Sequence, residues 1–190
     1  ANGDWTFTVP ASKALADGSH AITARSMTYS EGGLATLLRT PIPSATPTNR
    51  TYQEFQNQHS FAALKDDGSV ITWGHSEYGG DSSAVADSLS SGVSQIFSNR
   101  LAFAALKDDG SVITWGHPDH GGNSSAVSSQ LSSGVIQVFS TQDAFAALKE
   151  DGSVITWGRS GFGANSSDVA SSLSSGVSYI FPANQAFAAV

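Results

Sequence analysis

The chain lacks cysteine, has few basic residues and contains no long apolar run. The absence of cysteine excludes disulfide frameworks, thiolate metal sites and cysteine nucleophiles. Nine Lys and Arg face sixteen Asp and Glu, which gives a formal net charge of −7. A chain of this charge has no basic surface for phosphates, so we expect no nucleic acid partner. No apolar run approaches the ~20 residues of a membrane span, so we expect no membrane insertion.

A 42-residue sequence repeat dominates the rest of the chain. The run FAALKDDGSVITWG at residues 61–74 returns unchanged at 103–116, as FAALKEDGSVITWG at 145–158, and in its first residues at 187–190. Residues 61–102 and 103–144 are identical at 30 of 42 positions. Repetition at this length predicts similar structural units that pack on their neighbours. We therefore divide this part into units 61–102, 103–144, 145–186 and a partial unit 187–190.

Each unit begins with the signals of a β-hairpin. Residues 61–65 and 69–74 flank Asp66, Asp67 and Gly68, where glycine can take a positive φ and aspartate can bind turn amides. The second arm is β-branched and aromatic, which is typical of a half-buried strand. We expect a further strand around residues 93–98, before the next hairpin. The sequence thus predicts an all-β fold.

A serine-rich connection follows each hairpin. In residues 81–89 we expect either a short helix, capped by Asp81 and closed by Gly92, or an irregular loop that turns Val85 and Leu89 inward. Asn123 and Asn165 are the equivalent caps in the next two units. On either interpretation, a unit contains three or four short strands and one connection.

The run LKDDGSVITWGHSEYGGDSS resembles the repeat of RCC1-like β-propellers, with alanine-leucine, a DG turn, valine, tryptophan-glycine and an aromatic-glycine pair. The 42-residue spacing is closer to the compact repeats of the β-lactamase-inhibitor protein II type. The resemblance covers residues 51–190 and implies tandem propeller-like blades. The histidine usual before the alanine-leucine strand is replaced by Ser60, Ala102, Ala144 and Ala186, so we do not expect the family's nucleotide-exchange activity.

Residues 1–42 lie outside the repeat. A tryptophan strand, an LADGSH turn and an ITA strand resemble the last third of the bacterial Ig-like repeats of surface adhesins. A complete Ig-like sandwich has about 100 residues, so we expect only its C-terminal β-hairpin. Residues 43–50 belong to a linker, because the prolines of this region resist both helix and central strand.

The number of units bears on closure of the fold. Three units and a partial fourth are fewer than the about four to eight blades of a closed propeller. We expect an open arc whose uncovered ends carry Phe55 and Val190, and self-association of the chain through these array ends. The alternative architecture is a β-trefoil, which has three repeats of about this length.

Several residue groups that could suggest a metal site or a catalytic site are better explained by structural roles in turns, loops and the core. The acidic DDG turns supply too few oxygens for Ca²⁺, and His75 and His117 correspond to Arg159 in the third unit, which removes a metal ligand there. No serine has an evident base and orienting acid. We expect no enzyme, no metal and no cofactor, with Ca²⁺ confined to the missing part of the Ig-like domain. Three tryptophans at one phase of the repeat are expected in the core: Trp73, Trp115 and Trp157.

The units differ in two loops, one after the Trp-Gly strand and one at residues 99–101, 141–143 and 183–185. A fixed framework with diversified loops is typical of a scaffold that presents recognition residues, although drift on exposed loops gives the same pattern. The first loop supplies the candidate ligand-binding residues: His75, Glu77, Tyr78, His117, Asp119, His120, Arg159 and Phe162.

Together these features predict a non-enzymatic binding or spacer module of a large bacterial adhesin-like repeat protein. We expect it to be extracellular or at the cell surface and to recognise a protein or glycan through its loops. The alternative is a propeller-type protein inhibitor or regulatory binder of a partner enzyme.

Overall fold

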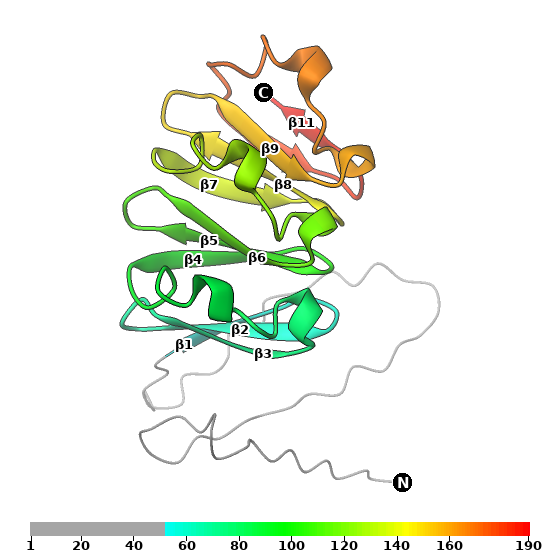
Figure 1. The fold of residues 1–190 in the computed structure, drawn as a ribbon. Coiled ribbons are helices and arrows are strands. Elements are labelled where there is room, and N and C mark those ends of the chain that lie inside the picture. Colours follow the sequence, from blue (N-terminus) through cyan, green and yellow to red (C-terminus); the bar gives the residue numbers. More distant parts are fainter. Residues whose placement is uncertain (1–51) are drawn as a thin grey trace, which may run out of the picture. The chain divides into compact units, whose positions relative to one another are not determined.

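The described residues form four small antiparallel sheets, which follow one another in chain order (Figure 1). The computed structural model describes residues 52–190, so the Ig-like and linker predictions lie outside them. We call the sheets blades 1, 2, 3 and partial blade 4. They consist of β1 (Tyr52–Gln56), β2 (Ser60–Lys65) and β3 (Val70–Gly74); β4 (Val93–Ser98), β5 (Ala102–Lys107) and β6 (Val112–Gly116); β7 (Val135–Ser140), β8 (Ala144–Lys149) and β9 (Val154–Gly158); and β10 (Ile180–Pro182) and β11 (Phe187–Ala189).

These sheets confirm the all-β prediction and its repeating unit. In each complete blade the middle strand pairs with both neighbours, in the orders β1-β2-β3, β4-β5-β6 and β7-β8-β9. The β-trefoil alternative is wrong, because each repeat supplies a sheet of its own and no sheet within residues 52–190 closes into a barrel. The same residues contain no helix long and apolar enough to cross a membrane.

The predicted hairpins and their acidic turns are confirmed. In blade 1, Leu64 pairs with Val70 across the DDG turn. The Asp67 carboxylate accepts hydrogen bonds from the Ser69 amide at 2.9 Å and from the Ser69 hydroxyl at 2.6 Å. These bonds, with a smaller effect of Lys65, lower the pKa of Asp67 to about 2. Because an ionised carboxylate is the better acceptor, the turn is held by a charged group.

The serine-rich connections contain short 3₁₀ turns and no α-helix: η3 (Ser83–Val85), η5 (Ser125–Val127) and η7 (Ser167–Val169). In the first connection, the Asp81 side chain accepts the Ser83 amide at 2.9 Å. Leu89 is buried and its carbonyl accepts the Val70 amide at 2.9 Å. The helical interpretation holds only for this single 3₁₀ turn, and a helix that continues to Gly92 is not formed, because the Leu89 carbonyl bonds to the neighbouring strand.

The apolar core lies between the blades rather than inside them. One buried cluster joins Ala62 of blade 1 to Phe103 and Trp115 of blade 2, and a second joins blades 2 and 3 in the same way. Phe103 pairs with Trp115 across the sheet, and their rings stack with centroids 5.2 Å apart. Small alanines on the middle strand let neighbouring sheets approach closely, as stacked repeats require.

One glycine in each of the first two units receives the aromatic pair of the next blade. Gly79, at φ +102, lies so close to Phe103 that an added Cβ would be 2.6 Å from the ring. Its carbonyl accepts the Trp115 indole N–H at 3.2 Å. Gly121 repeats the arrangement, with φ +95, an added Cβ 2.7 Å from Phe145 and a bond from Trp157. The contact therefore needs glycine for both conformation and space.

The three tryptophans are not buried equally. Trp115 and Trp157 are each 5% exposed, which confirms them as core residues. Trp73 is only partly buried, although it stacks on Phe61 as its counterparts stack on theirs. The prediction of an equal core role is wrong for Trp73, because blade 1 follows no blade within the described residues.

Candidate functional site

The two variable loops of each unit meet at one edge of the blades, which we call the rim. The rim contains the first-to-second strand turns 57–59, 99–101, 141–143 and 183–185. It also contains residues His75, His117 and Arg159 with the 3₁₀ turns that follow them, η2 (Ser76–Tyr78), η4 (Pro118–His120) and η6 (Ser160–Phe162). The opposite edge carries the invariant hairpin turns. The blades thus separate a varied edge from a uniform one.

Side-chain bonds tie the two rim loops together within each blade. Asn57 Nδ2 donates to the Tyr78 carbonyl and Asn99 Nδ2 to the His120 carbonyl, both at 2.6 Å. Thr141 performs the same role in blade 3 through its hydroxyl. Because each bond joins equivalent positions, the candidate residues hold the same place in every blade.

Backbone bonds tie the rim together between blades. The Gln58 amide donates to the Arg100 carbonyl at 3.2 Å, the Arg100 amide to Gln142 at 3.1 Å, and the Gln142 amide to Asn184 at 3.0 Å. We call this series, whose members are 42 residues apart, the turn ladder. It fixes the base of the variable loops.

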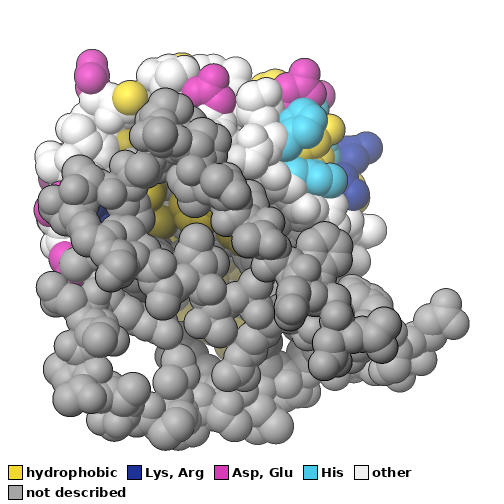
Figure 2. Space-filling model, turned by 90° about the horizontal axis from the view of Figure 1, so that it is seen from below, with side chains coloured by type: hydrophobic (Ala, Val, Ile, Leu, Met, Phe, Trp, Pro, Cys, Tyr) yellow, Lys and Arg dark blue, Asp and Glu magenta, His cyan; other side chains and the backbone are white. Residues whose placement is uncertain are grey.

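Histidine and tyrosine rings form a continuous cluster over blades 1 and 2. Tyr78 stacks on His75 at 4.4 Å between centroids and lies 4.8 Å from His59. It also reaches His117 of the next blade at 6.0 Å, and His117 meets His120 edge-on at 4.7 Å. Figure 2 shows histidine side chains gathered at one edge of the molecule beside basic and acidic groups.

A charged cluster continues the rim over blades 2 and 3. Asp143 is 0% exposed and its Oδ2 accepts from Arg100 Nη2 at 3.1 Å and from Arg159 Nη1 at 3.4 Å. His120 Nδ1 lies 2.8 Å from Oδ1 of the same carboxylate. The Arg159 guanidinium also lies over the Phe162 ring, 5.2 Å from its centroid.

All eight predicted candidates lie on the rim, but they are not equivalent. Tyr78 and His120 are partly or wholly buried and shape the surface. Glu77 and Asp119 are exposed and form no ion pair with another described residue. The rim also contains three residues that sequence reasoning did not select, His59, Arg100 and Asp143. The signal that could have found them is their place in the turns between the first and second strands, which vary from unit to unit.

Residues 52–190 contain no group of three histidine or carboxylate side chains able to hold a metal ion. His117 and His120 are neighbours, yet Arg159 takes the corresponding place in blade 3.

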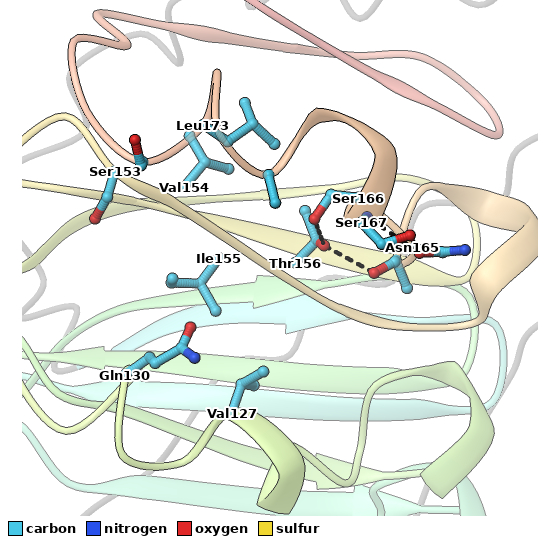
Figure 3. Close-up of a pocket in the computed structure, with 13 residues that line it drawn as sticks. Val127, Gln130, Ser153, Val154, Ile155, Thr156, Asn165, Ser166, Ser167 and Leu173 are labelled. Atoms are coloured by element: carbon cyan, nitrogen blue, oxygen red, sulfur yellow. Dashed lines mark hydrogen bonds between the residues drawn. The ribbon is translucent and has the colours of Figure 1, made fainter.

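A hollow lies between the connection of blade 2 and the outer strand of blade 3 (Figure 3). Val127 and Ile155 line its apolar part, while Thr156 donates to the Ala164 carbonyl at 2.8 Å and shares a bond with Ser166 at 2.9 Å. The same threonine-serine pair occurs in the other two blades. Because these bonds are internal and repeated, the hollow belongs to the framework.

Comparisons with protein-family profiles and with curated proteins find no match. Comparison with solved structures finds RCC1-like propeller proteins, the family that residues 51–190 resemble in sequence. Human WBSCR16 is 22% identical, with a TM-score of 0.35 over 53% of this chain and 32% of that one. Yeast RCC1 (Prp20), solved in a complex with Kap60, is 17% identical, with a TM-score of 0.40 over 62% of this chain and 32% of that one.

A second Prp20p structure from Saccharomyces cerevisiae, described with its binding to Gsp1p and histones, is also 17% identical. It has a TM-score of 0.40 and covers 63% of this chain and 34% of that one. The chain spans about a third of the length of these solved structures.

Proposed function

We propose that this chain is a non-enzymatic binding module that recognises a protein or glycan through its rim. The observation that carries the proposal is the meeting of both variable loops of every unit at one edge, over a framework that is otherwise nearly uniform. Loops positioned by a rigid scaffold are the usual place of recognition residues.

The chemistry of the rim favours a protein over a glycan. Tyrosine and arginine are enriched among residues that dominate protein interfaces, and the rim holds Tyr78, Arg100 and Arg159. A glycan requires an open aromatic face for stacking, whereas Tyr78 already stacks on His75 and lies close to His59. The turn ladder keeps these side chains in fixed positions, which lowers the entropic cost of binding.

We propose an extracellular or cell-surface setting, as part of a larger bacterial adhesin-like protein. The support is the resemblance of residues 1–42 to adhesin Ig-like repeats. A propeller-type inhibitor of a partner enzyme is the alternative, supported by the compact 42-residue spacing. Neighbouring Ig-like repeats in the full gene favour the adhesin, whereas a lone secreted propeller favours the inhibitor.

A catalytic role is not part of the proposal. Ser160, His120 and Asp143 approach the composition of a hydrolytic triad, and Ser160 and His120 both line a hollow on the rim beside Arg159. Within the described residues, however, the Ser160 hydroxyl makes no hydrogen bond to His120, and a nucleophile needs its base within hydrogen-bond reach.

The test is binding of the labelled 190-residue chain to bacterial and host cell surfaces and to a glycan array. A rim variant carries Tyr78→Ser, His120→Ser and Phe162→Ser, which change the same position of three blades. A matched control carries Asp66→Ala, Asp108→Ala and Glu150→Ala at the uniform opposite edge. We expect binding that the rim variant loses and the control keeps. Equal binding by both variants, with both folded by circular dichroism, contradicts the proposal.

A further inference from the structure

One cluster of the rim breaks the pattern of the repeat. Asp143 occupies a position that carries His59, Leu101 and Gln185 in the other copies, and Arg159 stands where the other units carry histidine. The two differences occur together, since Arg159 pairs with Asp143. Blade 3 therefore has a charge arrangement that no other described blade has.

The Asp143 carboxylate holds side chains from two blades. It is fully buried and lies 3.1 Å from Arg100 Nη2 of blade 2 and 3.4 Å from Arg159 Nη1 of blade 3. A buried carboxylate is strongly disfavoured without partners, which accounts for the convergence of two guanidinium groups. The two guanidinium groups carry one formal positive charge more than the Asp143 carboxylate neutralises.

The surplus charge faces solvent at Arg159. Its side chain is 53% exposed, compared with 29% for Arg100. The contact of Arg159 with Asp143 is long, at 3.4 Å, and uses one of the five N–H groups of a guanidinium. The Phe162 ring packs against it at 5.2 Å and limits its rotation. Its other donors are free for a ligand.

A hollow in front of Arg159 gives the ligand a place. Its walls are formed by Arg159 with the following residues: Pro118, Asp119, His120, Gly158 and Ser160. Ser160 and His120, whose side chains carry polar atoms, are among the residues that line the same space. A planar guanidinium beside further polar side chains matches the geometry of a carboxylate.

We propose that this hollow is a carboxylate-binding subsite of the rim, which takes an acidic group of the protein partner. The inference rests on the proposed function and names the chemistry of its ligand. Arg159 contacts the incoming carboxylate, and Asp143 is a positioning residue that holds Arg100 and Arg159 in place. The carboxylate comes from an aspartate or glutamate side chain or from a chain terminus, since both present the same two oxygens.

Asp119 opposes the incoming charge. It is exposed, lines the same hollow and forms no ion pair within the described residues. Its carboxylate therefore weakens the attraction of the subsite for an anion. Removing that charge strengthens binding, and removing the Arg159 charge weakens it. This opposition of sign distinguishes a carboxylate subsite from a general effect on folding.

The experiment is an NMR titration of the intact 190-residue chain, in which the arginine Nε–Hε signals are observed. The probes are N-acetylglutamate methylamide for a side-chain carboxylate, N-acetylglycine for a terminal one, and N-acetylglutamine methylamide as the neutral control. We expect a saturable shift of the Arg159 signal with at least one of the two acids, at a dissociation constant of about 1 mM or above. Which acid binds more tightly identifies the source.

Three variants complete the test. Arg159→His introduces the residue that the other two units carry at this position. We expect the acids then to cause no shift of the other arginine signals of the rim. Asp119→Asn is expected to tighten binding about two- to fivefold, the range of an exposed charge pair. Asp143→Leu, which copies Leu101, is expected to broaden the Arg100 and Arg159 signals and weaken binding.

No saturable shift with either acid overturns the subsite, as does an equal response to the neutral probe. Rim shifts that persist unchanged in Arg159→His also overturn the subsite. Histidine is found at the equivalent position of the other two units, so we expect this variant to fold. The proposed function is tested separately, by the rim variant and its control. If cell-surface binding requires the rim but is unchanged in Arg159→His, the subsite is refuted and the binding module stands.

Discussion

Replacing Trp115 by alanine tests whether the contact between blades stabilises the fold. Trp115 is 5% exposed, stacks on Phe103 and donates to the Gly79 carbonyl of the preceding blade. A buried tryptophan removes roughly 200 Å² from water, worth about 5 kcal/mol at ~25 cal/mol/Å². Alanine retains part of that burial, and large-to-alanine core changes cost about 3–5 kcal/mol. We expect a loss of about 4 kcal/mol in the free energy of unfolding.

Trp73→Ala is the matched control, because it removes the same side chain at the same position of the repeat. Trp73 stacks on Phe61 at 5.4 Å, but it is only partly buried and its indole N–H has no partner among the described residues. Trp73 is more exposed than Trp115 and loses less buried area on truncation, so we expect a smaller decrease, of about 3 kcal/mol. The measurement is urea unfolding followed by far-ultraviolet circular dichroism, which does not depend on the tryptophan removed.

The comparison between the two variants decides the outcome. Equal urea midpoints for Trp115→Ala and Trp73→Ala would refute the argument, because the local ring stacking is the same and only the contact with the preceding blade differs. A loss below about 1 kcal/mol for Trp115→Ala has the same meaning, since ordinary surface substitutions reach that size.

Three further predictions concern single positions. Gly121→Ala is expected to destabilise the array by about 2–4 kcal/mol through strain and overlap, whereas Gly161→Ala, with nothing within 4 Å of the added Cβ, leaves the urea midpoint unchanged. The pKa of Asp67 lies at about 2, below its ordinary 3.8, so its contribution to the free energy of unfolding is present above about pH 4 and is lost as the pH falls toward 2. In Asp67→Asn we expect the free energy of unfolding to depend less on pH over this range. Phe181 is 54% exposed on partial blade 4, and we expect Phe181→Ser to reduce the concentration-dependent self-association seen by light scattering. A parent chain that stays monomeric at all concentrations would contradict this prediction.

The repeat made most of the fold predictable. A DG turn between two β-branched arms specifies a hairpin by local chemistry alone, and recurrence after 42 residues places the third strand before the next hairpin. The invariant phase of tryptophan likewise predicts a core position. What differs at Trp73 depends on a neighbouring blade, and no local pattern records whether a neighbour is present.

The connection and the rim show where sequence reasoning stops. In residues 81–89 the apolar spacing fits a helix or a loop, and the choice falls to the hydrogen bond between Val70 and Leu89, which is a tertiary contact. The first variable loop was identified from its differences between units. The role of Asp143 was not, because its partners Arg100 and His120 belong to another blade and become its neighbours only after the sheets stack.

The turn ladder has a consequence for how such a chain can change. The two junctions between complete blades use the same backbone bonds and the same glycine-to-tryptophan contact, so we expect one unit to accept another as its neighbour. Unequal crossing-over between nearly identical gene segments would then shuffle, add or delete whole units while the remaining loops stay aligned. An engineered chain with units 61–102 and 103–144 exchanged is expected to unfold at the parent's urea midpoint, within about 1 kcal/mol, while its rim displays a new order of charges. Failure of the exchanged chain to fold would show that the junctions are individually matched.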